Sequence, residues 1–293
     1  MILPKFEYHD PSTLDEACRI MAELKEKARP LAGGTDLLVN MRRGAVSPEN
    51  VVSLGRIEEL KGVNPSNAQL RLGACLTAAE IGQSREVNDL INPLGIGANS
   101  LGSPLIRNLA TIGGNLVTAR PAADLPPPLM AHGASVVLKN SSGKRTISLD
   151  NFFRGPGQTV MEPDELLTEI IIEKPPPYSG GGYIKLGARK TLVTSIVNVA
   201  AFLSLDGRDG TIISARVVLG AVAPVPMRTT SSEQVLLGEK PTDALFLRAG
   251  EAAAGDSKPI DDFRGSAEYR RAMVEVLTRR ALNMALSKAK EIG

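Results

Sequence analysis

Two short runs centred on paired glycines constrain this chain more than any other feature of its sequence. The first run, residues 31–36, contains Gly33 and Gly34, and the second, residues 111–115, contains Gly113 and Gly114. We interpret each run as following an extended stretch and offering bare backbone amides beside a side-chain hydroxyl, which together can bind a pyrophosphate. Neither run has the Gly-x-Gly-x-x-Gly or Walker spacing, so a dinucleotide held here would lie outside the Rossmann and P-loop folds.

The alternative interpretation is that these glycines only make tight turns, and it stays open for each run taken alone. A short helix predicted over residues 37–42 would direct its positive end at whatever the first run holds. We expect Asp36 to point toward that helix start, because a pyrophosphate would repel its carboxylate. Thr111 and Asn115 add a hydroxyl and an amide to the second run, and Asp124 could accept hydrogen bonds from a ribose or a ring amide.

The composition predicts a soluble protein of two domains with no strong charge. The chain has 293 residues, of which 43% are hydrophobic, and its 34 basic and 32 acidic side chains leave a formal charge of +2. Only 3% of the residues are aromatic, tryptophan is absent, and the basic residues are scattered. Nucleic acid is therefore excluded as a partner, because its binding needs a basic surface and usually stacking platforms.

The cysteines and histidines argue against a metal centre in this chain. Cys18 and Cys75 are far apart, form no Cys-x-x-Cys pair, and have neither His9 nor His132 beside them. We expect both cysteines to be reduced, small and buried. The N-terminus lacks a basic region followed by an apolar region, and no segment is long and apolar enough to span a bilayer, so we expect a cytoplasmic protein.

Periodicity and turn residues predict a mixed α+β chain. Thr13 and Glu16 have the spacing of a helix start, so we expect a helix from there to Lys27. Residues 95–111 are rich in glycine, serine and proline and are interpreted as a loop, while Asn140 and Gly143 delimit a hairpin turn. Further segments follow from the same signals: strands at 29–32, 51–54, 69–74, 135–139, 144–148, 167–173, 196–205 and 212–221, and helices at 37–42, 87–91, 231–237, 243–254 and 267–290. Thr77 and Glu80 open one more helix.

A run of three prolines and three glycines, residues 175–182, is the clearest break in composition. Consecutive prolines cannot continue the hydrogen bonds of a sheet, and three glycines raise the entropy cost of ordering the chain. We therefore place the domain boundary there. The first domain then covers 1–176, with subdomains of about 1–56 and 57–176, and the second covers 177–293. In the last predicted helix, an apolar stripe is interpreted as core rather than as a partner surface; it contains Tyr269, Met273, Val276, Leu277, Met284 and Ala285.

Lys185 lies on a strand predicted after the boundary, between apolar neighbours. It is either a solvated lysine at a strand edge or a contact for an anion or a flavin ring. The sequence contains no serine-centred elbow with a nearby histidine, so it shows no catalytic triad.

Taken together, these residues resemble the FAD-binding medium subunit of the molybdenum hydroxylases, the group of xanthine dehydrogenase and carbon monoxide dehydrogenase. The resemblance covers nearly the whole chain. It is most specific over residues 106–116 and 121–125, which are similar to the second flavin loop of the family, and residues 32–37 match the first. After the boundary, residues 219–224, Arg228 and residues 233–238 are similar to the C-terminal domain of this subunit.

The resemblance implies a vanillyl-alcohol-oxidase (PCMH) type FAD-binding domain of two α+β subdomains, followed by a C-terminal domain with a three-stranded antiparallel sheet and helices. Pyrophosphate contacts are implied for one set of residues: Leu31, Ala32, Gly33, Gly34, Thr35, Asp36, Leu37, Thr111, Ile112, Gly113, Gly114 and Asn115. Leu101 and Asp124 would lie on the adenosine or ribitol side, Leu167 would pack on the adenine, and Lys185 would lie near the isoalloxazine. Two departures from the family are the pair Thr35 and Asp36 and the lack of a tyrosine over residues 189–194 that could shield the flavin ring.

By the same resemblance, the chain is the noncovalent FAD subunit of a larger enzyme and has no catalytic residues of its own. A molybdenum cofactor on a large subunit would oxidise the substrate, and 2Fe-2S clusters on a small iron-sulfur subunit would carry electrons to the FAD. The flavin would pass them to an acceptor such as NAD or a quinone, and the complex would be a dimer of heterotrimers. Two rival hypotheses are a self-contained flavin oxidoreductase of the same domain type and a nucleotide-sensing scaffold without redox function.

Overall fold

The N-terminal unit is a small parallel sheet with two helices. The computed structural model describes residues 3–189 and 192–291; the expected domain ends at residues 1 and 293, and part of the 189–194 segment, lie outside them. The sheet has the order β1-β3-β2, and the elements are β1 (Glu7–His9), α1 (Leu14–Leu24), η1 (Lys25–Lys27), β2 (Ala28–Leu31), α2 (Leu37–Arg42) and β3 (Asn50–Ser53). The hydroxyl of Thr13 accepts a hydrogen bond from the amide of Glu16 and caps α1, as the sequence predicts, although the α-helix ends at Leu24 and the last turn is 3-10.

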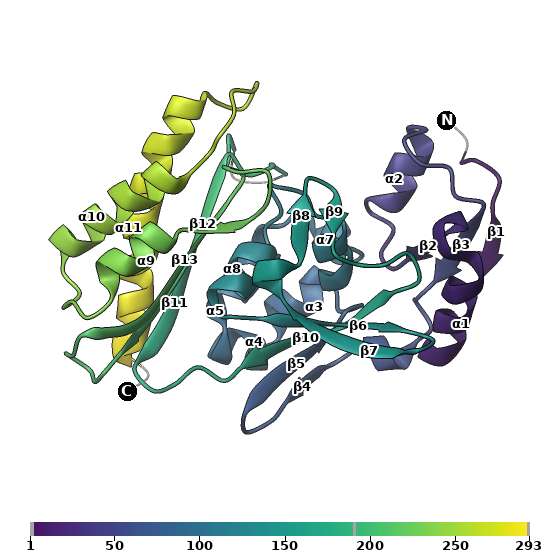
Figure 1. Cartoon of the computed structure of the whole chain (residues 1–293), viewed down its shortest axis with the longest axis horizontal. Helices are drawn as coiled ribbons and strands as arrows, with labels where there is room; N and C mark the ends of the chain where they lie inside the picture. Colours follow the sequence, from purple (N-terminus) through teal and green to yellow (C-terminus); the bar gives the residue numbers. More distant parts are fainter. Residues whose placement is uncertain (1–2, 190–191, 292–293) are drawn as a thin grey trace.

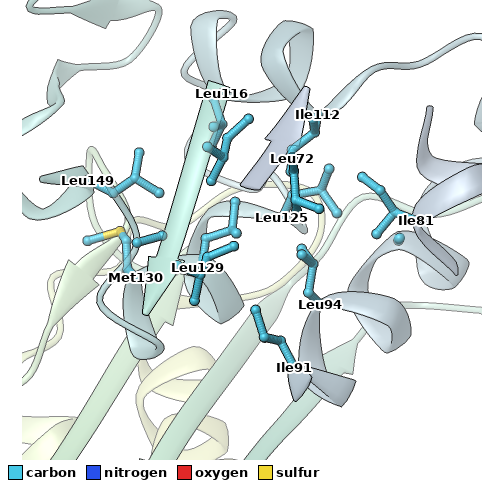
Figure 2. Packing of buried hydrophobic residues seen from close by; sticks show 14 of the residues in the cluster. Leu72, Ile81, Ile91, Leu94, Ile112, Leu116, Leu125, Leu129, Met130 and Leu149 are labelled. Carbon is cyan, nitrogen blue, oxygen red and sulfur yellow. The ribbon is translucent and has the colours of Figure 1, made fainter. Parts of the chain in front are cut away.

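The second unit is a five-stranded antiparallel sheet covered by short helices (Figure 1). Its strands, in spatial order, are β4 (Val63–Pro65), β5 (Gln69–Gly73), β10 (Leu166–Glu173), β6 (Ser135–Asn140) and β7 (Gly143–Ser148). The helices are α3 (Ala78–Gln83), α4 (Arg85–Leu90), α5 (Asn92–Ser100), α6 (Pro104–Arg107), α7 (Ile112–Val117) and α8 (Pro126–Ala131). Between helices and sheet lies an apolar core that includes Leu72, Leu94, Leu116 and Leu129 (Figure 2). Burial of these side chains holds the helices on one face of the sheet.

The prediction of a loop over residues 95–111 is wrong, because this segment contains most of α5 and all of α6. Gly95 and Gly97 serve helix packing, whereas Gly102, with a φ of +49°, lies in the bend between α5 and α6. A Cβ at Gly95 would lie 2.1 Å from Oδ1 of Asn88, and one at Gly97 would lie 2.8 Å from the carbonyl oxygen of Asp124. Consequently the second glycine run follows a helix and not an extended stretch.

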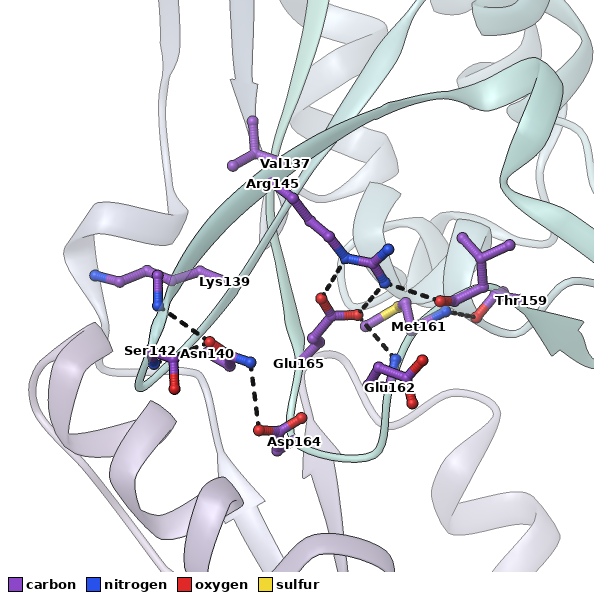
Figure 3. A network of polar contacts seen from close by, with 12 residues as sticks. Val137, Lys139, Asn140, Ser142, Arg145, Thr159, Met161, Glu162, Asp164 and Glu165 are labelled. Carbon is purple, nitrogen blue, oxygen red and sulfur yellow. Dashed lines mark hydrogen bonds and ion pairs between the residues drawn. The ribbon is translucent and has the colours of Figure 1, made fainter.

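A bidentate ion pair fixes the far end of this sheet (Figure 3). Arg145 on β7 donates to both carboxylate oxygens of Glu165, at 2.6 and 2.7 Å, and to the carbonyl oxygen of Val160 at 2.9 Å. The second oxygen of Glu165 also accepts from the amide of Glu162. The side chain of Glu165 is buried, and these bonds replace the water it loses. They hold the segment that follows the two-stranded ribbon of β8 (Phe153–Gly155) and β9 (Gln158–Thr159).

The C-terminal domain is an antiparallel sheet between two layers of helices. The sheet contains β11 (Ser179–Leu186), β12 (Val197–Leu205), β13 (Ile212–Gly220) and β14 (Met227–Arg228) in that order. It therefore has four strands and not the expected three, because the two residues of β14 pair with β13. One face packs against α9 (Thr230–Leu236), α10 (Asp243–Asp256) and α11 (Ala267–Glu291), and the other packs against α5 and α8 of the preceding domain.

Strand alternation assigns the side chains of this sheet to two cores. On β12, Val199 and Ala201 pack in the core with α10 and α11, whereas Ala200 lies in the core of the preceding domain. Tyr183 on β11 and Val218 on β13 also belong to the preceding core. The two domains thus share buried apolar surface instead of meeting through a polar interface.

The expectation that the glycines of the composition break reduce order is wrong for residues 180–182, because all three lie in β11. A Cβ at Gly180 or Gly182 would lie 2.4 or 2.2 Å from a carbonyl oxygen of α11, and one at Gly181 would lie 2.7 Å from the ring of His132. Helices press on this strand from both sides, so only glycine fits. The irregular connection is limited to residues 174–178.

The apolar stripe predicted as core in α11 is only partly buried. Leu277 and Ala285 are buried, but Tyr269 and Met284 are 44% and 37% exposed. The buried face instead includes the polar residues Arg270 and Thr278, among others, which an apolar pattern cannot indicate.

Candidate functional site

The first glycine loop presents a row of backbone amides without protein partners. It connects β2 to α2. Within the described part of the chain, no protein acceptor takes a hydrogen bond from the amides of residues 33–37. Gly34 has a φ of +71°, a conformation that favours glycine. Consecutive free N–H groups of this kind form a binding surface for an anion.

The second glycine loop, taken here as residues 109–115, lies against the first but uses its own amides differently. The turn expected at its glycines is not found, because Thr111 caps α7 and Gly113 and Gly114 lie in the first turn of that helix. An ideal Cβ on Gly33 would lie 1.7 Å from the carbonyl oxygen of Leu109, which places the two backbones in direct contact. The amides of Ile112 and Gly113 donate to the carbonyls of Leu76 and Ala74. The amide of Gly114 donates to the hydroxyl of Thr111. The amides of the second loop are therefore used in hydrogen bonds within the protein, and the first loop supplies the free donors.

Asn115 adds an unpaired side-chain acceptor to the second glycine loop. Its side-chain Oδ1 is buried and has no hydrogen-bond partner among the described residues. Its amide N–H donates to the carbonyl oxygen of Thr111 and begins the helical bonding of α7. A buried amide oxygen without a donor is costly, so the geometry favours a ligand group that donates to it.

Asp36 does not cap α2 through its side chain, contrary to expectation. Its carboxylate is half exposed and lies 4.0 Å from the guanidinium of Arg120, which follows α7. An exposed pair at this distance contributes little stability. The pair does show that Asp36, at the end of the first glycine run, and Arg120, after α7, face each other.

Lys185 is neither solvated nor free. Its side chain is 8% exposed, and its ammonium donates to Oδ2 of Asp124 at 2.6 Å and to the carbonyl oxygen of Ser100 at 3.0 Å. The alternation along β11 places this lysine on the face toward the preceding domain, on the same side as Tyr183. Lys185 and Asp124 thus form an ion pair across the junction of the two domains.

Two neutral donors complete the surroundings of Asp124. Ser195 donates to Oδ1 at 2.8 Å and Tyr183 donates to the same oxygen at 3.2 Å. Burial raises the pKa of Asp124, and the neighbouring ammonium of Lys185 opposes that rise. Burial and the Asp124 carboxylate raise the pKa of Tyr183, so this phenol stays protonated and can only donate to the carboxylate.

The remaining predicted residues lie in the core. Leu101 is 9% exposed at the end of α5, and Leu167 is 5% exposed on β10. A contact of Leu167 with an adenine stays a prediction. Sequence reasoning missed Ser195 and Asn198, whose side chains bond to each other and to residues 123 and 124. The strand pattern on β12 signals Asn198, as a polar residue among apolar ones; Ser195 precedes the strand and has no such signal.

Two surface cavities lie away from this site. One of about 350 Å³ is lined by α1 and the β6–β7 hairpin, and one of about 130 Å³ lies beside His132 and Arg216. Within residues 3–189 and 192–291, no three metal-ligating side chains come together. Among the described helices, none is both long and apolar enough to cross a membrane.

Comparison with protein families supplies the class that this fold and site define. Residues 4–175 match the FAD binding domain in molybdopterin dehydrogenase. Residues 182–285 match the CO dehydrogenase flavoprotein C-terminal domain. The expected α+β fold, with a PCMH-type FAD-binding domain followed by this second domain, is therefore confirmed apart from the strand count.

Individual relatives align with this chain over nearly its full length. The chain is 33% identical to the carbon monoxide dehydrogenase medium chain of Hydrogenophaga pseudoflava, with 98% of this chain and 99% of the relative covered. It is 28% identical to a putative xanthine dehydrogenase FAD-binding subunit of Escherichia coli, over 96% of both chains. A solved structure of the Hydrogenophaga carbon monoxide dehydrogenase superposes with a TM-score of 0.93 at 32% identity, covering 98% and 99% of the two chains. The chain belongs to the FAD-binding medium subunits of the molybdenum hydroxylases.

The residues at the glycine loops fit an FAD group. The diphosphate of FAD is an acceptor, and the free amides of residues 33–37 are donors. The hydroxyl groups of FAD can donate, and Oδ1 of Asn115 is a buried acceptor without a donor. The donor and acceptor sets of protein and cofactor therefore match.

Proposed function

We propose that this chain carries electrons through FAD inside a molybdenum-containing hydroxylase or dehydrogenase. Bound FAD supplies the redox chemistry, and the chain supplies binding and electrostatics. Electrons arrive from 2Fe-2S clusters on a small subunit after the molybdenum subunit has oxidised the substrate, and they leave to an external acceptor. The family match supports the flavin role, and the route of the electrons is the proposed part.

One observation carries this proposal: the first glycine loop keeps its amides free while its backbone rests on the second loop. We propose diphosphate contacts for residues 31–37 and contacts with the rest of FAD for Thr111, Asn115, Asp124 and Lys185. Substrate oxidation then belongs to another subunit.

The partner subunits are proposed on the same basis. Relatives that match over the whole chain are named medium chains or FAD-binding subunits. Leu105 and Leu109, beside the second glycine loop, are 77% and 55% exposed, which supports coverage of this face in a complex. The proposed assembly is one iron-sulfur, one FAD and one molybdenum subunit, present twice. Native mass spectrometry of the copurified complex tests this stoichiometry.

The domain division at 176/177 also stays a proposal. The two family matches end at residue 175 and begin at residue 182, which supports it. The core that both domains share argues that neither is an independent folding unit.

The direct test is to express the chain with its partner genes and purify the complex. We expect a flavin absorption band that substrate bleaches anaerobically and that the external acceptor restores. If the isolated chain turns over a small organic substrate, it is a self-contained oxidoreductase instead. If flavin binds but substrate never reduces it, the chain is a nucleotide-binding scaffold.

A further inference from the structure

Among the residues that the structure describes, every side chain that donates to the Asp124 carboxylate comes from the opposite domain. Lys185, Tyr183 and Ser195 lie in the C-terminal domain, whereas Asp124 lies in the FAD-binding domain. Ser195 is fully buried, Tyr183 is 2% exposed and Asp124 is 7% exposed. No water shell can orient these groups, so their hydrogen bonds fix the carboxylate.

Two of the three ammonium protons of Lys185 have acceptors among the described residues, which leaves one proton to donate. An ammonium has three N–H groups, and those of Lys185 meet Oδ2 of Asp124 and the carbonyl oxygen of Ser100. These two acceptors fix the direction of the third N–H. Because Asp124 provides one of them, the direction depends on how firmly its carboxylate is held.

We propose that Ser195 and Tyr183 are positioning residues that hold Asp124, and through it the Lys185 ammonium, in one orientation toward the flavin. This inference rests on the proposed contact between Lys185 and FAD. Ser195 is itself held, because its Oγ accepts a bond from Nδ2 of Asn198 at 3.3 Å. Asn198 also donates to the carbonyl oxygen of Ala123, the residue before Asp124, so the backbone of this segment is fixed as well.

The chain offers a matched control for a test of Ser195. Ser204 is also a buried serine, on β12, but its hydroxyl has no hydrogen-bond partner in the described structure. Ser195→Ala removes a bond to a charged group, whereas Ser204→Ala removes none. Tyr183→Phe removes the second donor with little change in volume.

The experiment uses the whole purified complex. FAD is removed and titrated back, and the flavin midpoint potential is measured in each variant. We expect Ser195→Ala to weaken FAD binding roughly tenfold, the scale of one lost bond to a charged group. We also expect a lower midpoint potential, because the ammonium stabilises reduced flavin less well when its orientation is lost. Tyr183→Phe should give the same direction with a smaller change, and Ser204→Ala should match the parent.

A second background separates positioning from general stability. In the double variant Asp124→Asn with Lys185→Met, the ion pair is gone, so Ser195→Ala should no longer change affinity or potential. The proposal is overturned if Ser195→Ala and Ser204→Ala give the same affinity and potential, or if the effect of Ser195→Ala persists in the double variant. If the parent complex contains no flavin at all, the proposed function fails instead.

Discussion

At the scale of the residue, Gly33 is the position where the site tolerates least change. A methyl group there would lie 1.7 Å from the carbonyl oxygen of Leu109 and 3.3 Å from the amide nitrogen of Ala110. These are backbone atoms, so relief requires the two glycine loops to move apart. The contact between the two loops therefore depends on Gly33 having no side chain.

Gly33→Ala should lower the free energy of unfolding by about 2 kcal/mol, the usual range for overpacking, and should abolish FAD retention because the loops separate. Gly55→Ala is the control, since a Cβ there meets only the hydroxyl of Ser53 at 3.7 Å. Urea unfolding and the flavin-to-protein absorbance ratio measure both effects. A Gly33→Ala complex with full flavin content would contradict the contact we describe.

Single residues also show where sequence reasoning stops. The glycine loops are recognisable because a local motif predicts a local backbone shape. The partner of Lys185 is not, because Asp124 lies in the other domain and comes within 2.6 Å only in the folded chain. The same holds for Ser195, whose function as a donor depends on a residue far earlier in the sequence.

At the scale of the element, the helix α11 begins beside a loop that is held by ion pairs. Arg270, 1% exposed, pairs with Asp262 and donates to the carbonyl oxygen of Ala221. Asp262 also pairs with Arg264 at 2.6 Å. The hydrogen bonds from Arg264, and then from Arg270, hold the pKa of Asp262 well below its ordinary range.

A carboxylate with a lowered pKa in the folded state contributes stability at neutral pH and loses it as the pH falls below the unfolded value of about 3.9. Asp262→Asn should therefore cost about 3 kcal/mol at pH 7, because Arg270 stays buried without its acid, and should flatten the loss of stability in acid. Denaturant unfolding between pH 3 and pH 7 measures both, with Asp261→Asn as a neighbouring control. Equal stability of the two variants at pH 7 would refute this function of Asp262.

Helices and strands were predictable from the sequence where their apolar residues recur with a regular period. The strands β5, β6, β12 and β13 and the helices α1, α10 and α11 lie where alternation and capping place them. The helices α5 and α6 were missed because their glycines and prolines serve close packing and helix starts. Residues 180–182 were not assigned to a strand for the same reason. In a sequence, a glycine that a close contact requires cannot be told from a glycine that makes the chain flexible.

At the scale of the whole molecule, Asp150 joins the two domains. It lies in the 3-10 turn η3 (Leu149–Asn151) and pairs with Arg216 on β13 at 3.2 Å and with Arg228 on β14 at 3.0 Å. Arg228 also pairs with the buried Glu233 of α9. The pairing of β14, the strand absent from the expected sheet, helps to bring Arg228 into this cluster.

Asp150→Ala should destabilise the chain by about 2 kcal/mol, because two half-buried guanidinium groups lose a shared carboxylate. Asp209→Ala is the matched control: its pair with Lys290 is exposed and should contribute less than about 1 kcal/mol. Thermal unfolding of the complex measures the difference, and limited proteolysis near residues 174–178 reports loosening of the domains. Identical behaviour of the two variants would exclude Asp150 as a domain contact.

A structure determined with FAD bound is the sharpest test of the proposed diphosphate site. We expect diphosphate oxygens within hydrogen-bond distance of the amides of residues 33–37, with the second glycine loop beside them. FAD bound with its diphosphate away from the first glycine loop, and the amides of that loop still unpaired, would contradict this site.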